Sequence, residues 1–180
     1  MKKNVVIISS SLRKDSNSEA LAKAFMNGAI EGGNEVEMIS LAGKKIEFCK
    51  GCLACQKLGK CVISDDTNEI VNKMLEADVL VFASPVYYYS ISGQLKTMLD
   101  RANPLFSLDY RFRDVYFLSC AAEDEEETVV GAKTAVQGWI DCFGKAKLSG
   151  VVFAGGVNSA GDIKGQPASM EAYEMGKQIQ

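Results

Sequence analysis

The sequence predicts an α/β fold in which a parallel β-sheet is covered by helices on both faces. Short apolar runs alternate along the chain with longer segments whose apolar residues recur every three to four positions. Three of the runs are nearly continuous in Val, Ile, Leu and Phe, as expected for strands buried on both faces. These two observations favour strands connected by helices over an all-helical or all-β chain.

Five apolar runs are the candidate strands. The second run alternates polar and apolar residues from Glu35 to Ser40, so we place that strand at an edge of the sheet. The five candidates are Val5–Ile8, Val36–Ile39, Val79–Ala83, Val115–Cys120 and Val151–Ala154.

Amphipathic stripes between these runs predict the helices. No internal repeat and no Pro/Gly/Ser-rich linker interrupts the pattern, so residues 1–180 are expected to form a single domain. The first stripe is Leu21, Phe25 and Ala29; the second is Ile91, Leu95, Met98 and Leu99; the third is Val129, Ala132, Val136, Trp139, Ile140 and Phe143; a last helix is expected from Pro167 to the end.

Composition excludes several classes of function. The formal net charge is -3, which gives no basic surface for nucleic acid or anionic lipid. The first apolar run, Val5–Ile8, is too short for a signal sequence core or a membrane span, so a cytoplasmic protein is expected. The chain contains no histidine, which excludes imidazole-based triads and His-rich metal sites.

A loop rich in hydroxyl groups follows the first strand and leads into a helix. The loop, from Ser9 to Ser18, contains no glycine, and therefore has neither a dinucleotide-binding G-x-G-x-x-G nor a glycine-rich triphosphate loop. Serine hydroxyls beside the N-terminus of a helix suit a terminal monophosphate such as that of FMN. The alternative is an ordinary helix cap, because Ser and Asn favour helix starts without any ligand.

Three consecutive tyrosines, Tyr87–Tyr89, follow the third strand. Their rings are difficult to bury together in a loop and suit stacking on a flat ring. Pro85 stiffens the same turn, so that backbone groups nearby can meet the edge of such a ring at fixed positions. The alternative is that the tyrosines pack against a neighbouring subunit, and both can hold at a dimer interface.

The two loops resemble those of the NADPH-dependent FMN reductase family and its relatives, the iron-sulfur flavoproteins. The first loop resembles the Gly-Ser-Pro-Arg…Gly-Asn-Ser/Thr phosphate loop of the family, with Ser10 and Leu12 in place of Gly and Pro. The second resembles the family's second flavin loop and the helix after it. The similar segments are Ser10–Arg13, Ser16–Ser18, Ser84–Tyr87 through Lys96, Leu99–Arg101, Gly161–Ile163 and Ala172–Tyr173.

This resemblance implies a three-layer flavodoxin-like fold with a five-stranded parallel sheet in the order 2-1-3-4-5. It also implies FMN bound on the loops after the first and third strands, in a homodimer or homotetramer. On this basis Ser10, Ser11, Arg13, Ser16, Asn17 and Ser18 are assigned to the phosphate, Pro85, Val86, Tyr87 and Tyr88 to the ring, and Ala121, Ala122 and Glu123 to the other edge of the ring.

Four cysteines, Cys49, Cys52, Cys55 and Cys61, follow the second strand with the spacing C-x2-C-x2-C-x5-C. Four thiolates this close can complete a tetrahedral or cubane shell. The spacing resembles the compact cysteine motif of the iron-sulfur flavoproteins, which implies a 4Fe-4S cluster that passes single electrons to FMN. Structural zinc and metal-free thiols are the alternatives.

Two acidic groups are assigned to helix starts. Ser64, Asp65 and Asp66 are expected to cap the helix after the cysteines. The run Glu123–Glu127 is expected at a solvated helix start, because carboxylates are favourable near that end.

Together these features predict an FMN-dependent oxidoreductase. It would transfer electrons from NAD(P)H to a small acceptor such as a quinone, a nitro or azo compound or a flavin, a reaction that needs ring stacking more than a side-chain base. The alternative is an electron carrier with a 4Fe-4S cluster and a partner of the ferredoxin type. A non-catalytic receiver domain is disfavoured, because no acidic pair for magnesium follows the first strand.

Overall fold

The computed structural model describes residues 2–180, and its centre is a sheet of five parallel strands. The spatial order is β2-β1-β3-β5-β6, which is the expected 2-1-3-4-5 once the short β4 is set aside, and β2 lies at an edge. The α/β prediction and the strand order are therefore confirmed. The strands are β1 (Asn4–Ser9), β2 (Glu35–Ser40), β3 (Val79–Tyr87), β5 (Asp114–Cys120) and β6 (Lys147–Ala154).

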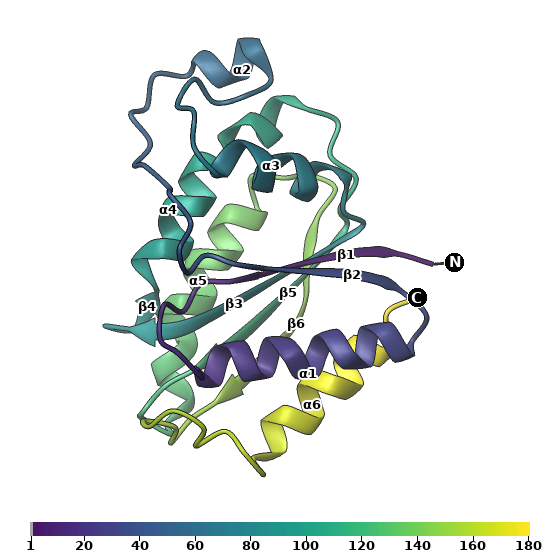
Figure 1. Cartoon of the computed structure of the whole chain (residues 1–180), viewed down its shortest axis with the longest axis vertical. Helices are drawn as coiled ribbons and strands as arrows, with labels where there is room; N and C mark the ends of the chain where they lie inside the picture. Colours follow the sequence, from purple (N-terminus) through teal and green to yellow (C-terminus); the bar gives the residue numbers. More distant parts are fainter. Residues whose placement is uncertain (1) are drawn as a thin grey trace.

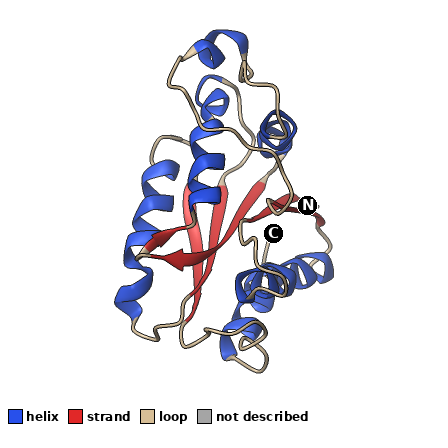
Figure 2. Ribbon diagram, turned by 60° about the vertical axis from the view of Figure 1, so that its left-hand side comes forward, coloured by secondary structure: helices blue, strands red, loops and turns tan. Residues whose placement is uncertain are grey.

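Helices cover both faces of this sheet (Figures 1 and 2). The sheet has a hydrophobic core on each face, and successive side chains of β1 point into one core and then the other. Val5 and Ile7 pack with α1 and α6, whereas Val6 and Ile8 pack with α3, α4 and α5. The helices are α1 (Asn17–Glu31), α3 (Thr67–Glu76), α4 (Gly93–Arg101), α5 (Val130–Ile140) and α6 (Pro167–Lys177).

The region that contains the four cysteines lies outside these layers. Its short helix α2 (Ala54–Leu58) is at the top of Figure 1, away from the sheet, and packs against the 3-10 helix η1 (Asn103–Ser107). We call residues 48–63 the cysteine segment. Its contact with the rest of the fold therefore includes η1, which follows α4.

The third strand is longer than predicted and ends in a hairpin. Val86 and Tyr87 pair antiparallel with Ile91 and Ser90 of β4 (Ser90–Ile91). The connecting residues Tyr88 and Tyr89 have φ of 49° and 58°, the left-handed backbone of a two-residue type I′ turn. Such turns usually contain Asn-Gly, so a run of three tyrosines does not predict one. We call Val86–Ile91 the tyrosine hairpin.

The predicted limits of two helices are corrected. Ile91 belongs to β4, and α4 begins at Gly93 behind the cap Ser92, whose hydroxyl accepts the N–H of Leu95. Val129 lies in the 3-10 helix η2 (Glu126–Val129) and Phe143 follows α5. Ile91, Val129 and Phe143 are nevertheless buried in the core as predicted, because an apolar side chain can be buried whether its backbone is helical or not.

Within residues 2–180, no helix is long and apolar enough to cross a membrane.

Candidate functional site

The hydroxyl-rich loop after β1 forms the N-terminal approach to α1. Ser16 is the helix cap, and its Oγ accepts the N–H of Glu19 at 3.2 Å. The first helical bond joins the N–H of Ala20 to the carbonyl of Ser16, so the N–H groups of Asn17 and Ser18 point out of the helix end without intrahelical partners. These two donors and the positive end of the helix define a place for an anion.

Asn17 joins this loop to a second loop that follows β6. Its Nδ2 donates to the carbonyl of Ser159 at 2.9 Å, while its Oδ1 accepts the N–H groups of Gly161 and Ile163 at 3.1 and 3.3 Å. The Asn17 amide is thus used within the protein, and only its backbone N–H faces outward. Arg13 reinforces the same junction, because its Nη1 donates to the carbonyl of Asn158 at 2.7 Å.

A cavity of about 260 Å³ lies where the loops after β1, β5 and β6 meet the end of β3. These are the carboxyl ends of the parallel strands, where open α/β sheets bind their ligands. Ten of the thirteen residues that the sequence assigned to the cofactor line it: Ser11, Arg13, Ser16, Asn17, Ser18, Pro85, Val86, Tyr87, Ala121 and Ala122.

A second cavity, of about 340 Å³, adjoins the first and shares Val86, Ala121 and Ala122 with it. The tyrosine hairpin forms one wall, and Glu123 and Thr128 form the other. The Glu123 carboxylate accepts the hydroxyls of Tyr89 and Thr128 at 3.2 and 2.9 Å, which connects the hairpin to the loop after β5. Contact with Glu123 raises the pKa of Tyr89.

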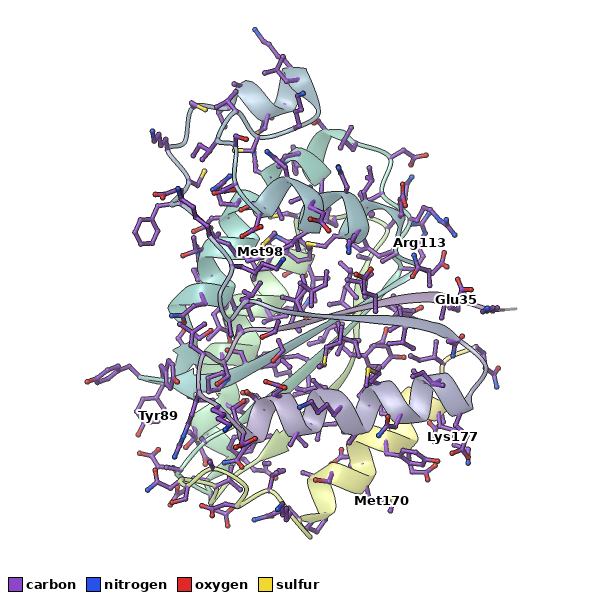
Figure 3. All side chains as sticks on the ribbon, in the orientation of Figure 1. Glu35, Tyr89, Met98, Arg113, Met170 and Lys177 are labelled. Atoms are coloured by element: carbon purple, nitrogen blue, oxygen red, sulfur yellow. The ribbon has the colours of Figure 1, made fainter. Side chains whose placement is uncertain are left out.

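In Figure 3, Tyr89 and Arg113 mark opposite ends of the sheet, and Tyr89 is at the end where the strands β3 and β5 finish.

The remaining three assigned residues lie outside the first cavity. The Ser10 hydroxyl donates to the carbonyl of Ala83 at 3.1 Å and accepts the Ser92 hydroxyl at 2.8 Å, which ties the loop after β1 to β3 and to the start of α4. Tyr88 is fully exposed at the turn and, like Glu123, lines the second cavity.

Sequence reasoning missed three residues that line the first cavity. Val157 and Asn158 belong to the loop after β6, next to the Gly161–Ile163 segment that carries part of the family resemblance. Cys120, the last residue of β5, is the third. Burial raises the pKa of the Cys120 thiol to about 11 in spite of its contact with Ser18, so this thiol stays protonated at neutral pH.

All four cysteines of the C-x2-C-x2-C-x5-C motif line one further cavity, of about 320 Å³. Two hydrogen bonds already reach its sulfurs: Asn103 Nδ2 donates to Cys55 Sγ at 3.0 Å, and the Gly51 N–H donates to Cys49 Sγ at 3.5 Å. Within residues 2–180, no three Cys, Asp or Glu side chains lie close enough to bind one metal ion. The four cysteines thus line a common cavity but do not converge on one position.

A buried ion pair anchors the cysteine segment. The Arg101 guanidinium contacts both oxygens of Asp65, with Nη1 at 2.7 Å and Nη2 at 2.9 Å, and both side chains are fully buried. Asp65 also accepts the N–H of Thr67, the first residue of α3, at 3.1 Å, whereas Asp66 at the N-cap position makes no side-chain bond to the helix. The pairing of Asp65 with Arg101 was not foreseen.

The ion pair shifts the pKa of both partners. Burial alone would raise the pKa of the Asp65 carboxyl, but Arg101 and the N–H groups of Glu47 and Thr67 lower it to about 2. Burial would likewise lower the pKa of Arg101, yet contact with Asp65 and with the Cys61 sulfur raises it. Both groups are therefore charged at neutral pH.

A larger cavity, of about 580 Å³, lies between the loop 41–48 and α4. It touches the hydroxyl-rich loop only through Leu12, and its other walls include Phe48 and Thr97. Neither the N–H groups at the start of α1 nor the tyrosine hairpin reaches it. Its size alone does not make it the site, because the convergent polar groups lie in the smaller cavity.

The strand order defines a flavodoxin-like α/β protein, and the cavity at the carboxyl ends of its strands has donors that suit a phosphate-bearing ligand. The model of the NADPH-dependent FMN reductase family matches residues 3–131, and the chain belongs to this family.

Two kinds of relative are similar to this chain. An iron-sulfur flavoprotein of Methanocaldococcus jannaschii is 46% identical over 101 residues, which is 56% of this chain and 52% of the relative. An iron-sulfur flavoprotein of Archaeoglobus fulgidus is 38% identical over 92 residues, 51% of this chain and 42% of the relative. The chain thus spans about half the length of the curated relatives it matches.

Among solved structures, an NAD(P)H:quinone oxidoreductase from Methanothermobacter marburgensis superposes with a TM-score of 0.76 at 19% identity, covering 98% of this chain and 96% of that one. This likeness supports the fold.

Proposed function

We propose that the chain is an FMN-dependent oxidoreductase that takes electrons from NAD(P)H and delivers them to a small acceptor, within one domain of residues 1–180. The observation that supports it most is one cavity lined by ten residues, from three separate segments of the chain, that the sequence assigns to FMN. Membership of the FMN reductase family supports the same cofactor.

The donors of the site suit the phosphate of FMN. The N–H groups of Asn17 and Ser18 lack intrahelical partners, and the Arg13 guanidinium supplies a positive charge beside them. The Ser11, Ser16 and Ser18 hydroxyls add further donors. This set compensates a dianion without a metal ion, as helix N-termini do at other phosphate sites.

The walls beyond these donors suit the ring. Pro85, Val86 and Tyr87 continue the cavity along β3, and Ala121 and Ala122 close it from β5. FMN, when bound, accepts a hydride from the reduced nicotinamide and passes electrons on to the acceptor. The protein's part is to hold the ring flat and to leave its exposed face open to a second ring.

The second cavity is the proposed entry for the nicotinamide and the acceptor. It adjoins the ring walls and is bounded by Tyr88, Tyr89 and Glu123. The tyrosine rings suit planar partners such as quinones and azo compounds. Tyr87 and Tyr88 are 52% and 102% exposed, so the hairpin also has surface left for the second subunit of the proposed homodimer or homotetramer.

A stopped-flow experiment tests the reaction. The protein is loaded with FMN without oxygen and mixed with NADPH or NADH while the flavin absorbance is followed. We expect rapid bleaching by at least one nicotinamide and recovery of the colour on adding a quinone or an azo dye. Bound FMN that neither nicotinamide reduces would contradict the proposed enzyme.

A second candidate is an iron-sulfur flavoprotein that exchanges electrons with a ferredoxin-type partner. The specific support is the cysteine segment, whose four sulfurs line a 320 Å³ cavity. A 4Fe-4S cluster, when bound, supplies one-electron transfer. Four thiols that line one cavity are the donor set that such a cluster requires, and structural zinc and metal-free thiols remain the alternatives that the experiment separates.

Anaerobic reconstitution with iron and sulfide tests this candidate. We expect about four irons per chain in the wild type and loss of iron in Cys52→Ala. Cys142→Ala is the matched control, since Cys142 is also exposed but lies outside the segment. A wild type that takes up zinc or no metal would reject the cluster and leave the flavin enzyme standing.

A further inference from the structure

Arg101 is placed to control the shape of the cysteine segment. It is the last residue of α4 and one of the largest fully buried side chains. Its Nη1 donates to the carbonyl of Glu47 at 2.6 Å, and its Nη2 donates to the carbonyl of Ile63 at 3.3 Å. Glu47 immediately precedes the segment and Ile63 ends it, so one guanidinium fixes both ends of the loop that carries the four cysteines.

Asp65 holds the guanidinium in this position. Its two oxygens take one bond each from Nη1 and Nη2, and Oδ2 also accepts the N–H of Glu47 at 2.9 Å. A planar fork of this kind suits Arg and cannot be reproduced by Lys. The ends of the segment are therefore fixed by one Arg–Asp unit before any ligand is bound.

One donor of Arg101 is left over. Within residues 2–180, Arg101 Nε is one of three buried side-chain atoms without a hydrogen-bond partner. A buried unpaired N–H is costly, so it calls for an acceptor. The Cys61 sulfur lies near the guanidinium and, after Asp65, contributes to the raised pKa of Arg101.

We propose that Arg101 is the positioning residue of the proposed cluster site: its fork holds the two ends of the cysteine segment, and its unpaired Nε–H is a donor available to a sulfur of the bound cluster or its ligands. This inference rests on the second candidate function, the cluster on Cys49, Cys52, Cys55 and Cys61. A thiolate or cluster sulfur would be the acceptor that Nε lacks, and the buried positive charge would favour the more reduced, more negative cluster.

The first arm of the test uses the metal-free full-length chain. Hydrogen–deuterium exchange of residues 47–63 is compared in wild type, Arg101→Lys and Asp65→Asn. We expect at least tenfold faster exchange in both variants, because Lys keeps the charge but loses the fork. Arg111→Lys is the control, since Arg111 pairs with Asp78 in an exposed ion pair away from the segment. Unchanged exchange in Arg101→Lys would overturn the clamp whether or not a cluster exists.

The second arm uses protein reconstituted with iron and sulfide. We expect Arg101→Lys to retain less than half of the wild-type iron while FMN affinity is unchanged. In the protein that remains loaded, Arg101→Gln should lower the cluster's midpoint potential and Asp65→Asn should raise it, because they remove charges of opposite sign. Shifts of the same sign, or none, would overturn the donor role of Arg101.

The two arms separate the failures. A wild type that binds no iron refutes the cluster, and with it the role of Nε, while the exchange data still decide the clamp. If Arg101→Gln does not fold, the sign of the shift in Asp65→Asn decides, and a potential that is unchanged or lowered there contradicts the proposal.

Discussion

Single residues at the start of α1 determine which ligand the site can hold. Two N–H groups, three serine hydroxyls and one guanidinium face the same cavity, and all of them are donors of the kind that a phosphate accepts. The Asn17 side chain serves a different purpose, since it holds the loop after β6 in place. Affinity for the phosphate and the shape of the site therefore depend on different residues.

Arg13 is the residue whose loss should separate phosphate from ring recognition. We expect Arg13→Gln to weaken FMN binding by about 2 kcal/mol, roughly 30-fold, because a charge-assisted hydrogen bond is lost. Riboflavin, which has no phosphate, should bind both proteins equally. Fluorescence titration measures both affinities, with Lys14→Gln as the neighbouring control. Equal weakening for FMN and riboflavin would contradict a phosphate contact.

The Asp65–Arg101 ion pair should make the unfolding free energy of the protein depend on pH in the acid range. The pKa of Asp65 is lowered to about 2 in the folded protein, so its contribution is fully present above the ordinary carboxyl pKa and is lost as the pH falls towards 2. At pH 7 we expect Asp65→Asn to cost about 3 to 5 kcal/mol of unfolding free energy, because Arg101 stays buried without its partner. Urea denaturation from pH 7 to pH 2 should show this difference shrink below about pH 4. A constant difference would contradict the ion pair.

The residue types of the site could be predicted from the sequence, but their individual contacts could not. Hydroxyls before a helix predicted an anion site, and ten of thirteen assigned residues share one cavity. Ser10 and Asn17 satisfy their side chains within the protein, and Asp65 pairs with a residue 36 positions away. Such partners depend on tertiary contacts, which local patterns do not encode.

At the scale of elements, the tyrosine hairpin is the feature that the sequence described least well. The sequence predicted a loop and part of a helix where the chain forms β3, a tight turn and β4. The turn residues Tyr88 and Tyr89 have left-handed backbones that cost about 1 to 2 kcal/mol each for non-glycine residues. Packing of the hairpin on α5 and the Tyr89–Glu123 contact oppose this cost.

The contact between this hairpin and α5 offers a test. A Cβ at Gly131 would lie 2.1 Å from the carbonyl oxygen of Tyr89, whereas one at Gly138 meets nothing within 4 Å. We expect Gly131→Ala to displace the hairpin, lower the unfolding free energy and weaken FMN binding. Gly138→Ala, on the exposed face of the same helix, should stabilise by up to about 1 kcal/mol and leave binding unchanged. Equal behaviour of the two variants in a urea and FMN titration would contradict this role for the hairpin.

At the scale of the whole molecule, the strand order brings the site together. Because β1, β3 and β5 are adjacent and parallel, the segments at their carboxyl ends meet although whole helices separate them in sequence. The alternation of apolar runs and helical stripes was enough to predict this order once the family resemblance was applied. The position of the cysteine segment, beyond the three layers, had no such signal.

FMN should stabilise the folded molecule as a whole. At a concentration 100 times its dissociation constant, a ligand bound only by the folded state adds about 2.7 kcal/mol, roughly 5 to 10 °C in the melting temperature of a chain this size. Riboflavin at the same concentration should add less, because it lacks the phosphate. Differential scanning calorimetry measures both shifts, and equal shifts would contradict the importance of the α1 N-terminus.

The most direct measurement is a crystal structure of the chain with FMN. We predict the phosphate within about 3 Å of the N–H groups of Asn17 and Ser18. The ring should lie between Pro85–Tyr87 and Ala121–Ala122. FMN bound in the cavity beside Phe48 and Thr97, or a phosphate directed away from α1, would contradict the account.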